Sequence, residues 1–153
     1  MIRAMTDRAL HLDSFIPYRL SVATNAVSAV IATLYQRRFA ISIAEWRVIA
    51  ILGESEPLAP RGIVERTKLD KVTVSRAAKA LETRGFVARA ADAADQRSHR
   101  LALTAEGRAL YETVAPEALA MEARLLADLA EWERGALDSL LRRVQAAAEA
   151  CDI

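Results

Sequence analysis

Apolar residues recur every three or four positions over most of the chain, which predicts a mainly helical fold. A first long helix is expected over residues 14–38, with apolar positions running from Ile16 to Leu34. Positions outside that stripe, such as Val22 and Ile31, are apolar as well. A helix that is apolar on most sides is usually buried, often against another subunit.

Two shorter helices are predicted next. The first covers residues 43–53, because Ser42 and Glu45 have the spacing of a capping box. Residues 57–60, Pro-Leu-Ala-Pro, are expected to form a short extended link, and residues 61–67 a short third helix. A turn then leads to the fourth helix.

The fourth helix is predicted over residues 71–84, with Asp70 as its N-cap and Gly85 just past its end. Helical periodicity divides its side chains between two faces. The apolar face carries Val74, Ala77, Ala78 and Leu81. The opposite face carries Val72, Arg76, Lys79 and Thr83, with Thr73 and Ser75 on its flanks. Such a helix packs on one side and presents a polar, cationic surface on the other.

A short β-hairpin is predicted after this helix, with strands at residues 86–90 and 99–103. The polar segment between the strands contains Asp95 and Arg97, which are close enough in a tight turn to pair and hold the arginine outward. An arginine held in this way can enter a DNA minor groove. The alternative interpretation is a polar turn that is merely solvated.

Two further helices complete the expected fold, over residues 105 to about 127 and residues 131–149. Thr104 caps the first of them, and Pro116 inside it predicts a bend rather than a break. The predicted class is therefore mainly α with a small β-hairpin wing. We assign a winged helix-turn-helix to residues 39–104, and helical dimerisation regions to residues 1–38 and 105–153.

Composition limits the class of protein. Hydrophobic residues make up 53% of the 153 residues, which is enough for a packed core. The N-terminus lacks the apolar core of a signal peptide, so a cytoplasmic protein without a membrane partner is expected. The single cysteine, Cys151, and the two histidines, His11 and His99, lack the spacing of metal ligands. Neither a metal nor a cofactor is expected.

Charge is distributed unevenly along the chain. Residues 60–100, the basic block, carry ten basic and five acidic side chains, a net +5. Residues 101–153 carry five basic and ten acidic side chains, a net −5. A protein that concentrates positive charge in one segment is suited to bind a polyanion there, although a solvated basic face is the alternative.

The outward face of the fourth helix has the chemistry of a DNA recognition helix. Arg76 can donate to guanine or to a phosphate, and Thr73 and Ser75 can donate to base edges or phosphates. Val72 can pack on a thymine methyl group, while Lys79 is expected to meet a backbone phosphate. The alternative is an ordinary amphipathic surface helix.

The run from Trp46 to Gly107 resembles the MarR family of bacterial transcription regulators. The matching pieces are KVTVSRAAKALETRGFV, the wing DAADQRS, and LALTAEG at the start of the next helix. The family's wing commonly reads Asp-Arg-Arg, whereas this chain has Asp95, Gln96 and Arg97. The resemblance implies minor-groove contact by Arg97, braced by Asp95, and major-groove contact by the recognition helix. The full set of expected DNA-binding residues is Arg61, Lys71, Val72, Thr73, Ser75, Arg76, Lys79, Asp95 and Arg97.

The resemblance also implies a homodimer, with interlocking N- and C-terminal helices, that binds pseudo-palindromic double-stranded DNA. Most often such a protein is a repressor that a small aromatic or phenolic acid-like effector releases. The effector-binding candidates are Tyr18, Arg19, Asn25, Ser28, Trp46 and Arg47. The alternative is that Trp46 belongs to the core and that Asn25 is a satisfied interface group. Cys151 lies beside Asp152, which disfavours a reactive thiolate, so oxidant sensing is not expected.

Two other function classes are open to a chain of this kind. A winged-helix module that binds proteins rather than DNA does not need three cations, Arg76, Lys79 and Arg97, on the same surface. An enzyme needs a nucleophile–base set, a phosphate-binding glycine loop or a metal cluster, and the sequence contains none of these. The expected function is therefore sequence-specific DNA binding without catalysis.

Overall fold

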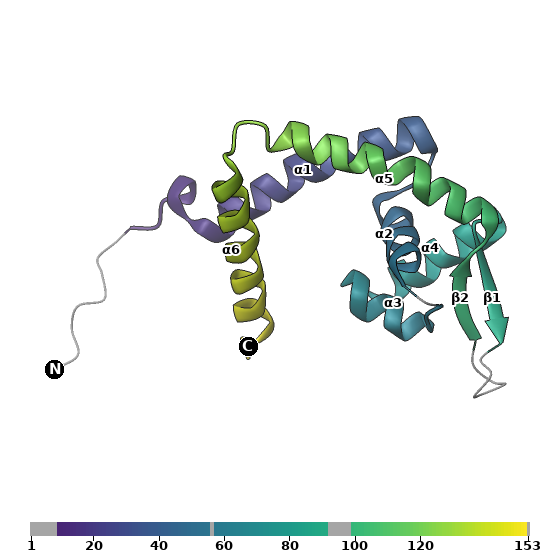
Figure 1. Ribbon diagram of the computed structural model, residues 1–153. Coiled ribbons are helices and arrows are strands. Elements are labelled where there is room, and N and C mark those ends of the chain that lie inside the picture. Colours follow the sequence, from purple (N-terminus) through teal and green to yellow (C-terminus); the bar gives the residue numbers. More distant parts are fainter. Residues whose placement is uncertain (1–8, 56, 92–98, 153) are drawn as a thin grey trace. The chain divides into compact units, whose positions relative to one another are not determined.

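The computed structural model describes residues 9–55, 57–91 and 99–152. The predicted Asp95–Arg97 pair and Gln96 lie outside the described residues. The described chain is mainly helical with a two-stranded antiparallel wing, as predicted (Figure 1). The elements are η1 (Leu12–Ser14), α1 (Ile16–Phe39), α2 (Ile43–Glu54), α3 (Pro60–Thr67), α4 (Lys71–Thr83), β1 (Val87–Ala91), β2 (His99–Leu103), α5 (Ala105–Leu125) and α6 (Glu131–Glu149).

The helix-capping predictions are confirmed. The Ser42 hydroxyl accepts from the Glu45 amide at 3.1 Å, and the Glu45 carboxylate accepts from the Ser42 amide at 2.7 Å. Asp70 accepts from the Thr73 amide at 2.8 Å at the start of α4. Thr104 accepts from the Gly107 amide at 3.0 Å at the start of α5. These side chains satisfy amides that have no partner within their own helix, and so fix where each helix begins.

The predicted extended link at residues 57–60 is wrong in part. Pro60 is the first residue of α3, where a proline loses nothing because the first amide of a helix has no acceptor. Leu58 forms an isolated antiparallel bridge with Leu101 of β2, with N–O distances of 3.1 and 2.8 Å. The segment before α3 therefore pairs with the wing, a long-range contact that local spacing does not reveal.

One core lies where α2 meets α3, α4 and β2, and Figure 1 shows these elements packed together. Its fully buried side chains include Ile41, Ile49, Ile63, Leu81, Leu101, Val48, Val74 and Val114. The chain divides into two compact units, Met1–Val114 and Ala115–Ile153. The first unit contains the helix-turn-helix and the wing, so it carries the candidate interface by itself.

The start of α5 is pressed against the turn between α4 and β1. Gly85 has φ +78°, a left-handed conformation that suits glycine after a helix. A Cβ atom on Gly107 would lie 1.9 Å from the carbonyl oxygen of Phe86, so only glycine fits there. This close approach fixes the position at which the chain leaves the wing and enters α5.

The terminal helices expose many apolar side chains. On α1, Ile16 is 63% exposed, and only Tyr35 of that helix is buried. The side chains of α6 are exposed or half-buried, and its large apolar ones are Trp132, Leu137, Leu140, Leu141 and Val144. The helix α5 continues past Pro116 without a break, as predicted. Among the described residues, no helix has the length and apolar character needed to cross a membrane.

Candidate nucleic-acid interface

The helix α4 has the two faces that its sequence predicts. Its buried side chains are Val74, Ala77, Ala78 and Leu81. On the opposite side Val72 is 58% exposed, and Lys71, Ser75, Arg76 and Lys79 are exposed as well. Small alanines on the inner face let α4 lie close to α2 and α3. Its whole polar face is thereby left accessible to a partner.

The cations on this face are available for binding. Lys71, Arg76 and Lys79 form no ion pair with any residue that the structure describes. Unpaired, solvated cations can neutralise phosphates without first breaking an internal contact. Ser75 lies between Lys71 and Lys79 on the same helix, so the face offers both charge and hydroxyl donors.

Thr73 is placed differently from its neighbours. Its hydroxyl donates to the Asp70 carboxylate at 2.6 Å, while its amide donates to the other carboxylate oxygen. The Thr73 side-chain hydrogen bond, followed by those from the backbone, lowers the pKa of Asp70 below its ordinary value. The hydroxyl proton of Thr73 is therefore held by the N-cap, and only the oxygen lone pairs remain for a partner.

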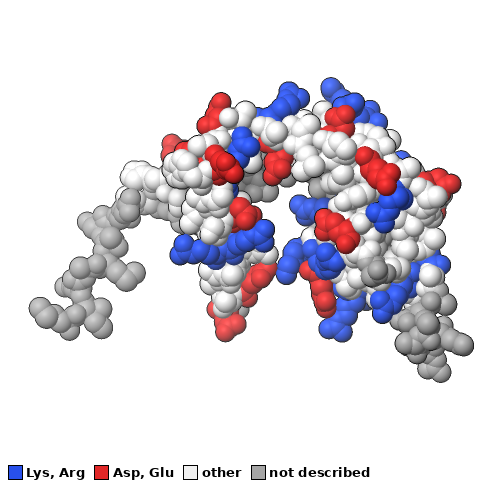
Figure 2. Space-filling model, in the orientation of Figure 1, with Lys and Arg blue, Asp and Glu red and all other residues white. Residues whose placement is uncertain are grey.

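The acidic residues in the described part of the basic block are all engaged. Glu65 pairs with Arg61 at 3.2 Å, and the side chains are 64% and 90% exposed. Asp70 caps α4, and Glu82 pairs with Arg89 of β1. The exposed Arg61–Glu65 pair is weak and solvent-screened. Figure 2 shows lysine and arginine side chains gathered along the lower edge of the unit Met1–Val114, over α3 and beside the wing.

The wing pairs in a simple register. Val87 lies opposite Leu103, Arg89 opposite Leu101, and Ala91 opposite His99. Residues that alternate along a strand share a face, so these three pairs lie on the same side of the hairpin. Val87 and Leu101 on that side are buried. The strands therefore hold the start and end of the wing tip next to each other, at Ala91 and His99.

A cavity of about 390 Å³ lies between α3, α4 and the hairpin. Its apolar lining comes from Pro60, Val64, Val74, Ala78 and Leu101, and its polar lining from Arg61, Lys71, Ser75 and Arg89. Residues of α4 and of the hairpin face the same open space, so direct packing does not join them there. The side of α4 that carries Lys71 and Ser75 is therefore loosely supported.

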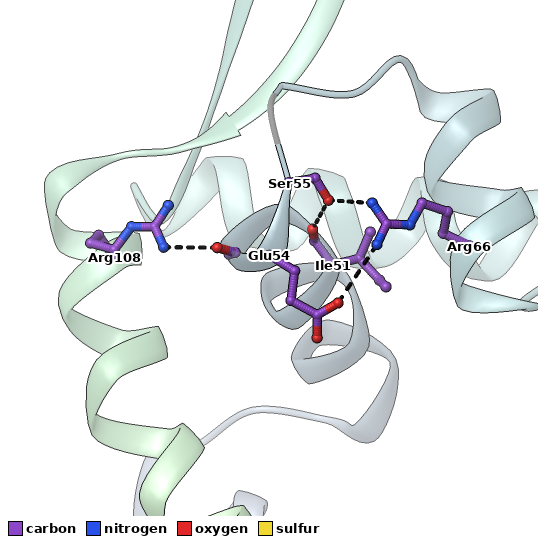
Figure 3. A network of polar contacts seen from close by, with 6 residues as sticks. Ile51, Glu54, Ser55, Arg66 and Arg108 are labelled. Atoms are coloured by element: carbon purple, nitrogen blue, oxygen red, sulfur yellow. Dashed lines mark hydrogen bonds and ion pairs between the residues drawn. The ribbon is translucent and has the colours of Figure 1, made fainter.

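The C-terminal end of α2 is held by two arginines from other helices (Figure 3). Arg108 of α5 donates to the carbonyl oxygen of Gly53 at 3.0 Å. Arg66 of α3 donates to the hydroxyl of Ser55 and lies 3.6 Å from the carboxylate of Glu54. Cations at a helix C-terminus are favourable because unsatisfied carbonyls accumulate there. Through these contacts, α3 and the start of α5 are both attached to the C-terminal end of α2.

The predicted effector residues do not gather into one site within a single chain. Tyr18, Arg19 and Asn25 are exposed on the first part of α1, and Arg47 is exposed on α2. The Trp46 ring contacts Tyr35 near the end of α1, and the 17 residues from Tyr18 to Tyr35 rise by about 25 Å along a helix. Ser28 is half-buried between these positions. A common site would need another element to complete it.

The structure does reveal an aromatic cluster that the sequence analysis missed. Trp46 stacks on Tyr111 of α5 with ring centroids 5.9 Å apart, and lies 5.7 Å from the ring of Tyr35. Burial raises the pKa of Tyr35, and the nearby charge of Arg47 partly offsets the rise. No sequence motif joins these residues, because the cluster forms between three helices. Trp46 is half-buried and packs against both rings.

Metal binding has no support in the described ranges, where no group of three or more histidine, cysteine, aspartate or glutamate side chains could hold an ion. Cys151 is exposed and free.

Comparison with known proteins supports the same interpretation. A model of the MarR family matches residues 41–98. The chain is 30% identical over 104 residues to YwoH, an HTH-type transcriptional regulator of Bacillus subtilis, a match that covers 68% of this chain and 75% of YwoH.

Solved structures extend the likeness over most of the chain. A MarR/EmrR family transcriptional regulator from Acinetobacter sp. ADP1 has a TM-score of 0.85 and 27% identity, covering 93% of this chain and all of that one. Bordetella bronchiseptica BpsR, whose DNA binding is regulated by 6-hydroxynicotinic acid, has a TM-score of 0.84 and 25% identity. That match covers 94% of this chain and 99% of BpsR.

Proposed function

We propose that this chain acts as a homodimeric repressor. It belongs to the MarR family, whose members are DNA-binding transcription regulators and not enzymes. It binds pseudo-palindromic double-stranded DNA and is released by a small aromatic or phenolic acid-like effector. The observation that carries the DNA-binding part is the exposed face of α4, with three cations unpaired among the described residues.

In this proposal α4 enters the major groove. Arg76 donates to guanine or to a phosphate, Ser75 to a base edge or phosphate, and Val72 packs on a thymine methyl group. Lys71 and Lys79 contact the backbone, and Arg61 joins them when its exposed pair with Glu65 opens. Thr73 contributes through its oxygen and through the start of the helix. Arg97, braced by Asp95, enters the minor groove from the wing.

The exposed apolar surfaces of α1 and α6 support a dimer. A lone chain would leave Ile16, Trp132 and Leu140 more than half exposed, which is costly for large apolar side chains. A two-fold dimer presents two copies of α4 and therefore fits half-sites about one helical turn, ~34 Å, apart. The acidic segment at residues 101–153 then belongs mainly to the dimerisation region, away from the DNA.

An effector is supported by BpsR, whose DNA binding is regulated by 6-hydroxynicotinic acid, an aromatic acid. The proposed contacts in this chain are Tyr18, Arg19, Asn25, Ser28, Trp46 and Arg47. Arg19 and Arg47 are exposed and can pair with a carboxylate. Because these residues do not meet within one chain, the effector site is completed by the second subunit.

Selection of bound fragments from random or genomic DNA, followed by fluorescence anisotropy on the selected operator, tests the proposal. Arg76→Ala should weaken operator binding by about 5- to 150-fold, the range for a lost bidentate base contact. Arg142→Ala removes an equal charge from an exposed pair with Asp138 on α6 and serves as the control. Equal affinity for Arg76→Ala and wild type would show that α4 does not read the operator.

The effector part is tested separately, by adding aromatic and phenolic acids to the protein–operator complex. Release at a concentration that leaves the protein folded supports regulation by such a compound. A complex that no member of the series dissociates would remove this part of the proposal and leave DNA recognition intact.

A further inference from the structure

Arg89 occupies an unexpected position in the wing. It lies opposite Leu101 and shares the inner face of the hairpin with Val87, and both of these apolar side chains are buried. A long cationic side chain at the centre of such a face does not contribute to an apolar core. Its side chain is 52% exposed, and its guanidinium has specific polar partners.

The guanidinium of Arg89 joins three elements. Its Nε donates to Oε1 of Glu82 on α4 at 2.5 Å, and its Nη1 lies 2.9 Å from Nε2 of His99 on β2. A guanidinium only donates, so Nε2 of His99 is the acceptor in this contact. One side chain on β1 therefore connects the recognition helix to both strands of the wing.

We infer that Arg89 is a positioning residue for DNA recognition, which fixes the wing on the recognition helix through Glu82 and His99. It acts on DNA through the wing and not by direct contact. The inference rests on the proposed minor-groove role of the wing.

The cavity between α4 and the hairpin explains why such a tether is needed. Val74, Ser75 and Ala78 of α4 line it on one side, and Arg89 and Leu101 of the hairpin on the other. Apolar packing alone therefore does not fix the distance between helix and wing at this level. The Glu82–Arg89–His99 contact joins the helix to the hairpin beside this cavity and adds to the packing of the buried Val74, Ala78 and Leu101.

The tether also lies at the right place along the wing. At the base of the hairpin, the hydroxyl of Thr104 donates to the carbonyl oxygen of Gly85, and the Leu58–Leu101 bridge attaches β2 to the body at the level of Arg89. On the side of the wing tip, the tether reaches His99, which is the first residue of β2. A contact at His99 therefore holds the start of β2 against α4 through Arg89.

Glu82 provides the second argument. A carboxylate in the last turns of a helix is opposed by the helix dipole, and within a basic block it also repels DNA. Its side chain is only 21% exposed, so the charge is partly desolvated as well. These costs are offset if the carboxylate holds Arg89 in place.

Loss of the Glu82 charge and loss of its contact with Arg89 should change operator affinity in opposite directions, which provides a test. Removal of an acid from a DNA-binding surface strengthens binding on charge alone. The inference predicts the reverse for Glu82→Ala: operator affinity falls by about fivefold or more, because the wing is no longer fixed. Glu65→Ala is the matched control, since Glu65 is also an acid of the basic block paired with an arginine, and its affinity should be unchanged or higher.

Arg89→Lys distinguishes a role of Arg89 as a tether from a role as a positive charge alone. A lysine keeps the positive charge but cannot bridge Glu82 and His99 with a planar fork, so binding should fall nearly as far as in Glu82→Ala. In an Arg97→Ala background, Glu82→Ala should cause no further loss, because the wing contact is already gone. Thermal unfolding of each variant confirms that the fold is kept, and Arg89→Lys remains informative if Glu82→Ala is unstable.

The outcomes distinguish this inference from the proposed function. If Arg97→Ala binds the operator with the same affinity as wild type, the wing does not contact DNA. The proposed wing role and this inference are then both wrong. If Arg97→Ala weakens binding while Glu82→Ala strengthens it, or while Arg89→Lys binds as wild type, only the tether is overturned.

Discussion

At the scale of single residues, the start of α4 shows how one side chain is divided between structure and recognition. Asp70 accepts two hydrogen bonds from Thr73, one from the amide and one from the hydroxyl. The cap thus orients the first turn of α4, the proposed recognition helix. It also places a negative charge beside the exposed face of α4, and Lys71 is the next residue in the sequence.

Asp70→Asn should make the protein less stable at neutral pH and less sensitive to acid. The folded-state pKa of Asp70 lies below its ordinary value of 3.8, so its carboxylate stabilises the fold above that pH. This contribution disappears as the pH falls through the lowered pKa. Thermal melts over a pH series should therefore show a lower melting temperature for the variant at pH 7, and this difference should close in acid. A constant difference would show that the carboxylate charge is not responsible.

Lys79→Ala tests the division between backbone contact and base reading along α4. Lys79 is exposed one turn beyond Ser75 and should contact a phosphate. We expect operator and random DNA to lose affinity by similar factors, with the slope of log affinity against log salt reduced by about 1. Anisotropy titrations at several salt concentrations give this slope. A loss confined to the operator would instead place Lys79 at a base edge.

At the scale of elements, the helix boundaries follow from short-range chemistry that a sequence displays openly. Ser42, Asp70 and Thr104 each mark a helix start, and the apolar face of α4 follows from spacing alone. The bridge between Leu58 and Leu101 could not be predicted, because it joins residues 43 positions apart with no pattern between them.

The same limit applies to the candidate site. The exposed α4 residues could be chosen from helical periodicity, whereas the engagement of Thr73 with Asp70 depends on the rotamers of both. The aromatic cluster around Trp46 and the role of Arg89 depend on contacts between elements. Periodicity assigns a residue to a face of its own element, but it does not say what another element brings to that face.

Two glycines in helices should respond in opposite ways to alanine. Gly107→Ala places a Cβ atom 1.9 Å from the Phe86 carbonyl oxygen, so α5 must move from the wing, and we expect a loss of about 2 kcal/mol or more in unfolding free energy. Gly135 of α6 has nothing within 4 Å of such an atom, and alanine there should stabilise by about 0.5–1 kcal/mol. Urea unfolding measures both. Equal effects at the two positions would contradict the close approach at Gly107.

At the scale of the whole molecule, the proposed DNA binding and most of the proposed dimerisation fall on different segments of the chain. Residues 60–100 carry a net charge of +5, and residues 101–153 carry a net charge of −5. The side chains proposed to contact DNA lie in the unit Met1–Val114, whereas the exposed apolar side chains of α6 lie in the unit Ala115–Ile153. A dimer formed by the terminal helices would present two basic faces at a fixed spacing.

Leu140→Glu on α6 should convert the proposed dimer to a monomer. Leu140 is 52% exposed in the single chain, and a carboxylate buried in an apolar interface carries a large desolvation cost. Sedimentation should show the mass halved, and operator affinity should fall because the two half-sites are no longer bound together. Arg143→Ala, at an exposed position on the same helix, changes the net charge by the same amount, −1, and serves as the control. A variant that remains dimeric would exclude this surface of α6 from the interface.

The bridge between Leu58 and Leu101 has a consequence for the exchange of amide protons with solvent. Both amides are bonded across the bridge, and the side chain of Leu101 is 1% exposed, so neither amide exchanges until the wing separates from the segment before α3. Leu58 precedes α3 in what is otherwise a connection between helices, where amides commonly exchange within seconds. Deuterium uptake at Leu58 therefore reports how often the wing opens, and a compound that loosens the wing would accelerate uptake there.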